Sequence, residues 1–100
     1  MTVENQSEQL SEHKLKPRQR DILKALVQEY INTADPVGSE TIRRVGKLEV
    51  SSATIRNELT SLEKEGYIEQ PYTSAGRVPT AEGYRYFVEE LMEEVSLPLP

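Results

Sequence analysis

The 100-residue chain has no cysteine and no tryptophan, and its single histidine, His13, lies in a polar N-terminal stretch. The absence of cysteine excludes disulfide bonds and thiolate metal sites, and it removes any argument for an oxidising compartment. His13 has no cysteine and no second histidine with which to share a metal ion. We therefore expect no metal site and no cofactor.

Long hydrophobic runs and catalytic motifs are also missing. No stretch approaches the roughly 18 apolar residues of a membrane-spanning helix, and the first residues lack the basic and apolar regions of a signal peptide. The sequence contains no Gly-x-Ser-x-Gly, no His-Glu-x-x-His and no glycine-rich phosphate loop. These absences predict a cytoplasmic protein that is not an enzyme.

Length and composition indicate one small domain with ends outside the core. Hydrophobic residues make up 36% of the chain and charged residues 29%, against globular averages of roughly 45–50% and 25%. Residues 1–13 are polar and acidic without periodicity, so we interpret them as a disordered leader. Residues 14–96 form the predicted domain. Residues 97–100, Leu-Pro-Leu-Pro, are interpreted as the start of a linker to a missing C-terminal region.

The formal net charge of −5 is unevenly distributed along the chain. Residues 1–12 carry three glutamates and no cation, and residues 81–100 carry five glutamates and one arginine. Residues 13–80, by contrast, carry eleven lysines and arginines against nine acidic residues. The acidity therefore lies at the two ends, and the middle of the chain stays compatible with a polyanionic partner.

Apolar residues recur at helical spacing after Pro17, a residue that suits the first turn of a helix. We predict a helix over about 17–32, which must end before Asp35-Pro36 because proline disfavours a helical residue ahead of it. The apolar face of this helix consists of Ile22, Leu23, Leu26, Val27, Tyr30 and Ile31.

A helix-turn-helix pattern follows. Ser39 is placed to cap a short helix over 40–45, and Gly46 lets the chain turn. Ser51 or Ser52 then caps a third helix. The apolar residues that hold these two helices and the turn between them to the core are Ile42, Val45, Leu48, Val50, Ile55, Leu59 and Leu62.

Beyond Gly66, which ends the third helix in a left-handed conformation, the sequence predicts a small hairpin. Residues 67–70 have the aromatic and β-branched character of a strand, residues 71–76 form a loop, and Arg77-Val78 returns as a second strand.

Thr80 caps a final helix that ends near Ser96. Its apolar stripe consists of Tyr84, Phe87, Val88, Leu91, Met92 and Val95. Three helices followed by a hairpin predict a mainly α fold with a small β-hairpin, in the order of a winged helix-turn-helix.

The third helix turns its polar residues away from the core when Ile55, Leu59 and Leu62 face inward. Arginine can bond the edge of guanine in the major groove, asparagine that of adenine, and serine and threonine either. In a helix-turn-helix the second helix of the motif presents such residues to the bases. We predict that this face reads DNA, although a solvated helix face has a similar composition. It holds Ala53, Thr54, Arg56, Asn57, Thr60, Ser61 and Lys64, and no acidic residue.

Cations around this helix are candidates for phosphate contacts. Those at the start of the first helix oppose the helix dipole, so phosphate contact would explain their placement; a charged, solvated helix start is the alternative. The candidates are Arg18, Arg20, Arg43, Arg44 and Lys64, with Lys14 and Lys16 close by in the sequence.

The hairpin tip over 71–77 combines an aromatic residue, two hydroxyls, a glycine and an arginine. Such a tip can follow a phosphate backbone or place Arg77 in a minor groove. Gly76 can adopt a conformation closed to other residues, which would bring the backbone close to a phosphate and aim Arg77 outward. The alternative is a structural arginine that pairs with Glu69 across the hairpin.

Five blocks of sequence together resemble the N-terminal DNA-binding domain of the heat-inducible transcription repressor, or HrcA, family. They follow the family's order and spacing over about residues 15–95. The blocks are Asp35-Pro36-Val37-Gly38-Ser39, Val50 to Leu59, Leu62 to Glu69, Thr73 to Thr80, and Gly83-Tyr84-Arg85-Tyr86.

The resemblance implies a winged-helix domain that reads double-stranded DNA at an inverted-repeat operator upstream of chaperonin and Hsp70 operons. It also implies a homodimer in the full-length protein, with the chaperonin assisting the active state of the repressor. By motif, the base-reading residues would be Ser51, Ser52, Thr54, Arg56 and Asn57, and the wing residues Thr73, Ser74 and Arg77.

The chain departs from the family in two places. Thr60-Ser61 stand where the family more often has Ala-Asp, and the large C-terminal part that serves dimerisation and sensing is absent, so we expect a monomer. Two alternatives stay open beside the DNA-binding hypothesis. A winged-helix protein interaction module would require an exposed apolar patch on the third helix, and an unrelated winged-helix regulator would share only the fold.

Overall fold

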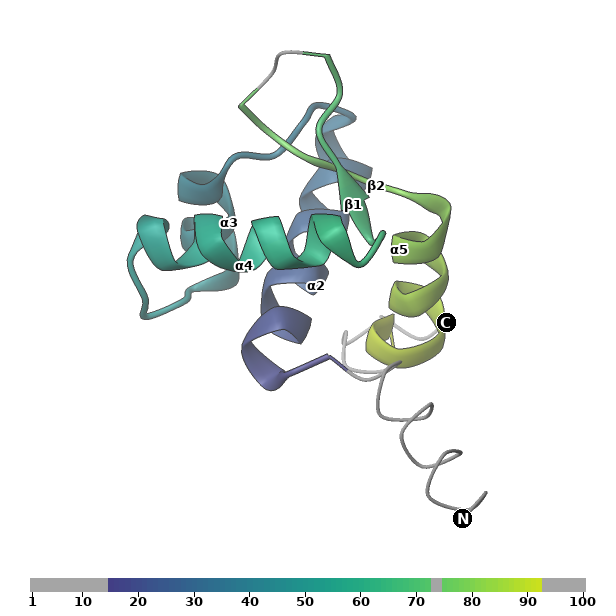
Figure 1. The fold of residues 1–100 in the computed structure, drawn as a ribbon, viewed down its shortest axis with the longest axis horizontal. Helices are drawn as coiled ribbons and strands as arrows, with labels where there is room; N and C mark the ends of the chain where they lie inside the picture. The colour runs from purple at the N-terminus through teal and green to yellow at the C-terminus, as the bar shows by residue number, and fades with distance from the viewer. Residues whose placement is uncertain (1–14, 73–74, 93–100) are drawn as a thin grey trace, which may run out of the picture.

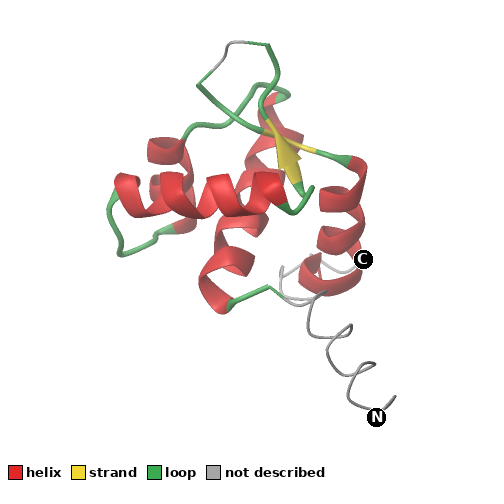
Figure 2. Ribbon diagram, in the orientation of Figure 1, coloured by secondary structure: helices red, strands yellow, loops and turns green. Residues whose placement is uncertain are grey.

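The computed structural model describes residues 15–72 and 75–92. Three helices come first: α2 over Pro17–Thr33, α3 over Ser39–Gly46 and α4 over Ser52–Lys64. A two-stranded antiparallel sheet of β1, Ile68–Glu69, and β2, Val78–Pro79, leads to α5, Ala81–Tyr86, which continues as the π-helical turn η1, Phe87–Leu91. Figures 1 and 2 show α4 crossing in front of α2, with the hairpin loop at one end and α5 at the side. The predicted fold class is confirmed.

Several predictions concern segments outside the described residues. They are the leader over 1–13, the linker over 97–100, and the residues Lys14, Thr73, Ser74, Val95 and Ser96. In the part of the chain that the structure describes, no helix is long and apolar enough to cross a membrane.

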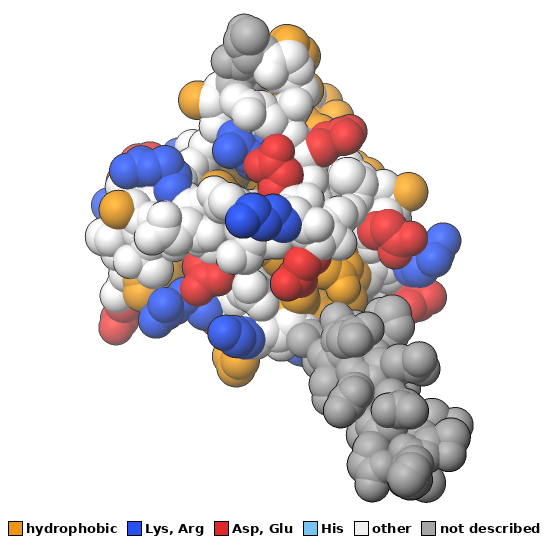
Figure 3. Space-filling model, in the orientation of Figure 1, with side chains coloured by type: hydrophobic (Ala, Val, Ile, Leu, Met, Phe, Trp, Pro, Cys, Tyr) orange, Lys and Arg blue, Asp and Glu red, His pale blue; other side chains and the backbone are white. Residues whose placement is uncertain are grey.

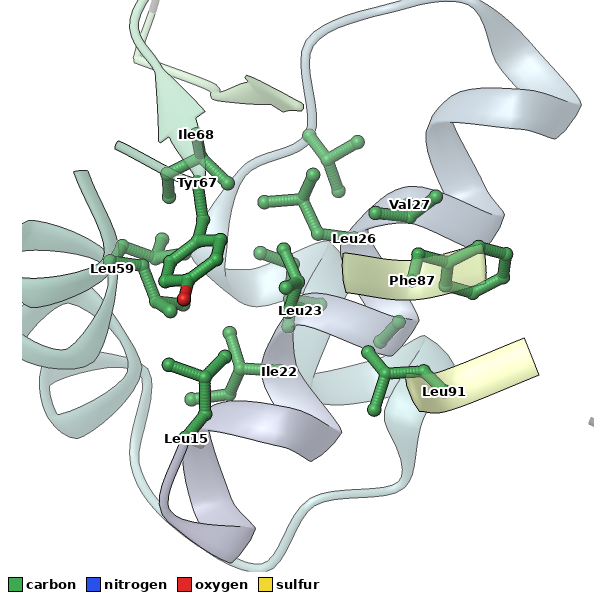
Figure 4. Close-up of a cluster of buried hydrophobic side chains, with 14 of the residues drawn as sticks. Leu15, Ile22, Leu23, Leu26, Val27, Leu59, Tyr67, Ile68, Phe87 and Leu91 are labelled. Atoms are coloured by element: carbon green, nitrogen blue, oxygen red, sulfur yellow. The ribbon is translucent and has the colours of Figure 1, made fainter. Parts of the chain in front are cut away.

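The core is built around α2. Ile22, Leu23, Leu26 and Val27 are almost completely buried, and Figure 4 shows side chains from α4 and β1 on one side of them and from η1 on the other. Ile31, which the spacing predicts on this face, is 58% exposed. At 100° per residue it lies about 180° from Ile22, at the far edge of the apolar stripe.

The start and end of α3 differ from the prediction. The helix is capped by the extended Gly38, and Ser39 is its first residue and makes no side-chain capping bond. The left-handed residue after the helix is Lys47, at φ 54°, rather than Gly46. Gly46 serves packing instead, because a Cβ there would stand 3.2 Å from the Ala25 Cβ on α2.

The predicted cap, end and buried side of α4 are confirmed. Ser51 is the cap residue, and its hydroxyl oxygen accepts a hydrogen bond from the Thr54 backbone nitrogen at 3.1 Å. Gly66 has the expected left-handed conformation, with φ at 88°. The core-facing residues Ile55, Leu59 and Leu62 are buried.

The hairpin is shorter than predicted. β2 begins at Val78, one residue later than expected, with Ile68 opposite Pro79 and Glu69 opposite Val78. Arg77 pairs with Val37 in the α2–α3 loop instead, through two backbone hydrogen bonds of 2.9 Å. Gly76 does not have a positive φ. It is required there because a Cβ would stand 2.7 Å from the Pro36 carbonyl carbon.

The last helix begins as predicted and then changes pitch. The Thr80 hydroxyl accepts a hydrogen bond from the Gly83 backbone nitrogen at 3.2 Å. Phe87 and Leu91 are buried, but Val88 is 57% and Met92 37% exposed. Among the described elements, α2 and α5 make the main contacts with η1, and η1 buries a narrower stripe than the sequence pattern suggests.

Candidate nucleic-acid interface

The outward face of α4 lies on the surface as predicted. Three buried residues on its opposite side hold the helix to the core, which leaves a continuous exposed stripe along its length. The exposed residues are Ala53, Arg56, Asn57, Thr60 and Lys64, with Thr54 and Ser61 half-buried at the margins. In Figure 3 this helix crosses the middle of the view.

Three hydroxyl groups on and beside this face, those of Ser51, Thr54 and Thr60, already have partners. Ser51 accepts from the Thr54 nitrogen, as described, and its own hydroxyl donates to the Thr54 hydroxyl oxygen at 3.1 Å. The Thr60 hydroxyl donates to the Arg56 carbonyl oxygen at 3.1 Å. Ser52 is half-buried in the first turn. These groups shape the start and the middle of the helix.

Arg56 and Asn57 differ from the hydroxyl residues. Both side chains are exposed, and within the described residues neither makes a hydrogen bond or ion pair. Their donors and acceptors are therefore available to another molecule, and they project from the second turn of α4. They are the two side chains on this face best suited to bond base edges.

Two glutamates at the margins of α4 are paired with arginines from other elements. Glu58 lies 3.7 Å from an Arg18 guanidinium nitrogen of α2, and Glu63 lies 3.0 Å from the Arg77 Nε of the hairpin. Each pair offsets a negative charge next to the exposed stripe, which lowers the electrostatic cost of bringing a polyanion to it.

The α3 cations are not equivalent. The Arg43 guanidinium bonds the Glu40 carboxylate at 2.7 Å, and this hydrogen bond lowers the pKa of Glu40. Arg44 is exposed, and so is Lys47 in the turn before α4; neither forms an ion pair among the described residues. Sequence reasoning misses Lys47, because the glycine signal attributes the turn to Gly46. The only sequence signal of Lys47 is its place between the two helices.

The predicted basic cluster at the start of α2 is partly built into the fold. Arg18 reaches Glu58, and an Arg20 guanidinium nitrogen donates to the Tyr86 hydroxyl at 3.2 Å. Lys16 is exposed ahead of the helix. The structure thus gives Arg18 and Arg20 partners within the protein and leaves Lys16 at the surface.

The hairpin arginine does not point outward. Arg77 binds Glu63 of α4, and its side chain is 18% exposed. The predicted alternative partner, Glu69, is therefore wrong. Glu69 pairs with Val78 in the two-stranded sheet. Glu63 lies in the last turn of α4, next to Arg77, whose backbone is held by its pairing with Val37. Thr73 and Ser74 lie outside the described residues, and Tyr72 beside them is 78% exposed.

The face that carries α4 shows no single basic surface. In Figure 3 blue and red side chains alternate around it. Within the described residues, no group of three histidine, cysteine or carboxylate side chains could hold a metal ion.

Comparison with known proteins shows which family this domain belongs to. The family model of the winged helix-turn-helix transcription repressor, HrcA DNA-binding, matches residues 14–93. The chain belongs to the HrcA family. Membership in this family excludes the unrelated winged-helix regulator.

Individual relatives agree with the HrcA family match. The chain is 60% identical over 80 residues to a heat-inducible transcription repressor HrcA from Carboxydothermus hydrogenoformans, and 58% identical over 84 residues to one from Desulforamulus reducens. These matches cover 80% and 84% of this chain, and 24% of each relative. The chain thus spans about a quarter of the length of these HrcA relatives.

A solved structure shows the same fold. The crystal structure of a hypothetical protein superposes with a TM-score of 0.76 at 50% sequence identity. The match covers 85% of this chain and 27% of the other. The described HrcA domain therefore has the arrangement found by experiment in a close relative.

Proposed function

We propose that the chain is the sequence-specific DNA-binding domain of a repressor of heat-shock chaperone genes, acting on an inverted-repeat operator in the cytoplasm. The observation that carries the proposal is the exposed, acid-free face of α4, where the Arg56 and Asn57 side chains have no partner among the described residues. It is the second helix of the helix-turn-helix, the element that enters the major groove in this motif.

The roles within the surface follow from the contacts. Arg56 and Asn57 read bases, Thr54 lies at the edge of the reading stripe, and Ser51 shapes the helix start through its capping bond. Ser52 and Thr60 are assigned secondary contacts because the first is half-buried and the hydroxyl of the second is bonded to the backbone.

Phosphate contacts come from the cations that stay at least partly exposed at the surface. Arg44, Lys47 and Lys64 are exposed and form no ion pair among the described residues. Arg43 and Arg18 keep about half of their side-chain surface exposed beside their carboxylate partners. The tip residues Thr73 and Ser74 complete the proposed contact on the hairpin side.

The competing function, a protein interaction module, requires an apolar patch on α4. The large hydrophobic side chains that are exposed in the described part of the chain are Ile31, Tyr72, Val88 and Met92. None of them lies on α4, so its exposed surface favours a polar partner.

The whole protein is proposed to act as a homodimer with one such domain on each half of the operator, and to depend on the chaperonin for its active state. The 100-residue chain is then a monomer that engages one half-site. Loss of the second half-site removes an avidity gain of about 10²–10⁴, so its binding is weak. Sedimentation at micromolar concentration tests this, and a tight dimer would contradict it.

Titration of fluorescent DNA tests the central proposal. One duplex carries a chaperonin-operon inverted repeat, and a control duplex has the same base composition in scrambled order. Each is titrated at two salt concentrations, because phosphate contacts make affinity fall with salt. The proposal requires tighter binding to the inverted repeat at both salt concentrations. Equal affinity for both duplexes would refute sequence-specific recognition.

A further inference from the structure

We propose that the ion pair between Arg77 and Glu63 sets the position of the wing relative to α4, so that both are positioning residues for DNA binding and neither is a DNA contact. The wing is defined here as the described residues 70–72 and 75–77, between β1 and β2. The inference rests on the proposed function, since it concerns the surface that α4 and the wing present to DNA together.

The wing depends on contacts outside its own ladder. β1 and β2 pair over only two residues each, and an isolated two-stranded hairpin is marginally stable in water. The base of the wing is fixed by the α2–α3 loop instead. Arg77 exchanges backbone hydrogen bonds with Val37, and Gly76 lies so close to Pro36 that a Cβ would stand 2.8 Å from the proline Cβ.

The Arg77 side chain connects the base of the wing to α4. Its Nε donates to Glu63 Oε1 at 3.0 Å, and its Nη1 donates to the carbonyl oxygens of Ala75 at 3.0 Å and Gly76 at 3.4 Å. The guanidinium is planar and holds its donors in a rigid fork. One side chain therefore fixes the turn carbonyls of the wing and a carboxylate of α4 at set positions relative to one another.

Burial and charge agree with a positioning role. The Arg77 side chain is 18% exposed, less than its partner Glu63 at 37%, so most of its surface is closed to a phosphate. A phosphate contact would also leave the Glu63 carboxylate beside the DNA, where it repels the backbone.

The two roles predict opposite effects of removing Glu63. If Arg77 contacts a phosphate, loss of the carboxylate frees the guanidinium and removes a repulsive charge, so DNA binding strengthens. If the ion pair positions the wing, the same change releases the wing and weakens binding despite the loss of a negative charge.

The experiment compares Glu63→Ala with Glu65→Ala in the 100-residue chain, using the inverted-repeat and scrambled duplexes described above. Glu65 is a matched control because it is an exposed carboxylate at the end of the same helix and forms no ion pair among the described residues. Both variants remove one negative charge. We expect Glu63→Ala to weaken binding to the inverted repeat by about three- to tenfold, as for a partly screened charge-assisted bond, and Glu65→Ala to leave it unchanged or stronger.

Two conservative variants separate position from charge. Glu63→Gln keeps an oxygen that can accept from the Arg77 Nε, so it should retain most of the affinity. Arg77→Lys keeps the positive charge but loses the fork, so it should weaken binding as Glu63→Ala does, with the dependence of log affinity on log salt unchanged. Stronger binding by Glu63→Ala, or full affinity in Arg77→Lys, would overturn the proposal.

Amide hydrogen exchange tests, without DNA, whether the ion pair between Arg77 and Glu63 holds the wing in place. In Glu63→Ala the amides of Val37 and Arg77, which bond each other's carbonyls, should exchange faster, while the amide of Leu26 in the core of α2 keeps its wild-type rate. Unchanged exchange at Val37 and Arg77 would show that the ion pair does not hold the wing. Equal binding of the wild-type chain to both duplexes would refute the proposed function instead. The exchange result would still decide whether the ion pair between Arg77 and Glu63 holds the wing.

Discussion

The hydroxyl oxygen of Tyr86 lies 3.2 Å from the backbone nitrogen of Leu15, 71 residues earlier in the chain. The same oxygen accepts a hydrogen bond from Arg20 at 3.2 Å, and the Tyr86 ring packs edge-on against Tyr67 at a centroid distance of 5.4 Å. One side chain at the end of α5 thus joins the beginning of α2 to the residue that precedes β1.

Tyr86→Phe should destabilise the domain by about 1–3 kcal/mol, because it leaves the buried Leu15 N–H without its acceptor. Urea unfolding followed by far-ultraviolet circular dichroism measures this loss. Tyr84→Phe is the matched control, since Tyr84 lies on the same helix, is half-buried, and its hydroxyl makes no hydrogen bond among the described residues. Equal stability of the two variants would contradict the structural role of the Tyr86 hydroxyl.

Gly83→Ala should destabilise the domain by more than about 2 kcal/mol, although alanine is the better helix former by roughly 1 kcal/mol. A Cβ at this position would collide with the Tyr67 carbonyl oxygen, which also accepts the backbone hydrogen bond of Thr80 at 3.1 Å. Thermal unfolding gives the comparison.

Gly38→Ser provides the control for the previous substitution. A Cβ at Gly38 would meet no atom within 4 Å, and this residue caps α3 with an extended backbone at φ −89°. Serine is a better cap than glycine by a few tenths of a kcal/mol, so this variant should be as stable as the wild type or slightly more so. A loss of stability in Gly38→Ser comparable to that of Gly83→Ala would show that close packing is not the cause.

The burial of Tyr67 should make the domain less stable to unfolding at alkaline pH. Burial raises the pKa of its phenol above the ordinary value of 10.0, because the folded protein disfavours the phenolate. The unfolded chain ionises first, so this contribution to stability is intact below about pH 10 and is lost as the pH rises through the folded-state pKa. Urea unfolding at about pH 8 and about pH 11 should show a smaller alkaline loss for Tyr67→Phe than for the wild type.

The features that the sequence predicts well depend on neighbours along the chain. Ser51 and Thr80 cap their helices, and Gly66 ends α4 in a left-handed conformation. The helical spacing of Ile55 and Leu59 identifies the buried side of α4, and with it the exposed side. Each of these follows from local hydrogen bonding or from periodicity, so a single sequence contains the information.

The features that the sequence does not predict depend on tertiary approach. Arg77 pairs with Glu63, 14 residues away, rather than with Glu69 across the hairpin, because the Val37 bridge directs it to the end of α4. Gly76 is needed for the close approach of Pro36 rather than for its backbone freedom. Composition and residue spacing do not show which loops pack together. On these signals alone, Arg77 is therefore predicted to contact DNA.

Alanine substitutions on α4 and in the turn before it should separate base reading from phosphate contact. Arg56→Ala or Asn57→Ala should weaken binding to the inverted repeat by about 1–3 kcal/mol and relax the preference at one base position, because each side chain can bond a base edge in two places. Both positions are exposed and free of partners in the described residues, so the fold should tolerate the changes, as circular dichroism would verify.

Arg44→Ala and Lys47→Ala are the comparison for those variants, since each removes an exposed cation without removing an ion pair among the described residues. They should weaken binding to the inverted-repeat and scrambled duplexes alike, and each should reduce the slope of log affinity against log salt by about 1. Titration of all four variants against both duplexes gives the slopes and the specificity ratios together. If Arg56→Ala lowered both affinities equally and reduced the salt slope, Arg56 would be a phosphate contact, and Asn57 would be left as the principal reader on α4.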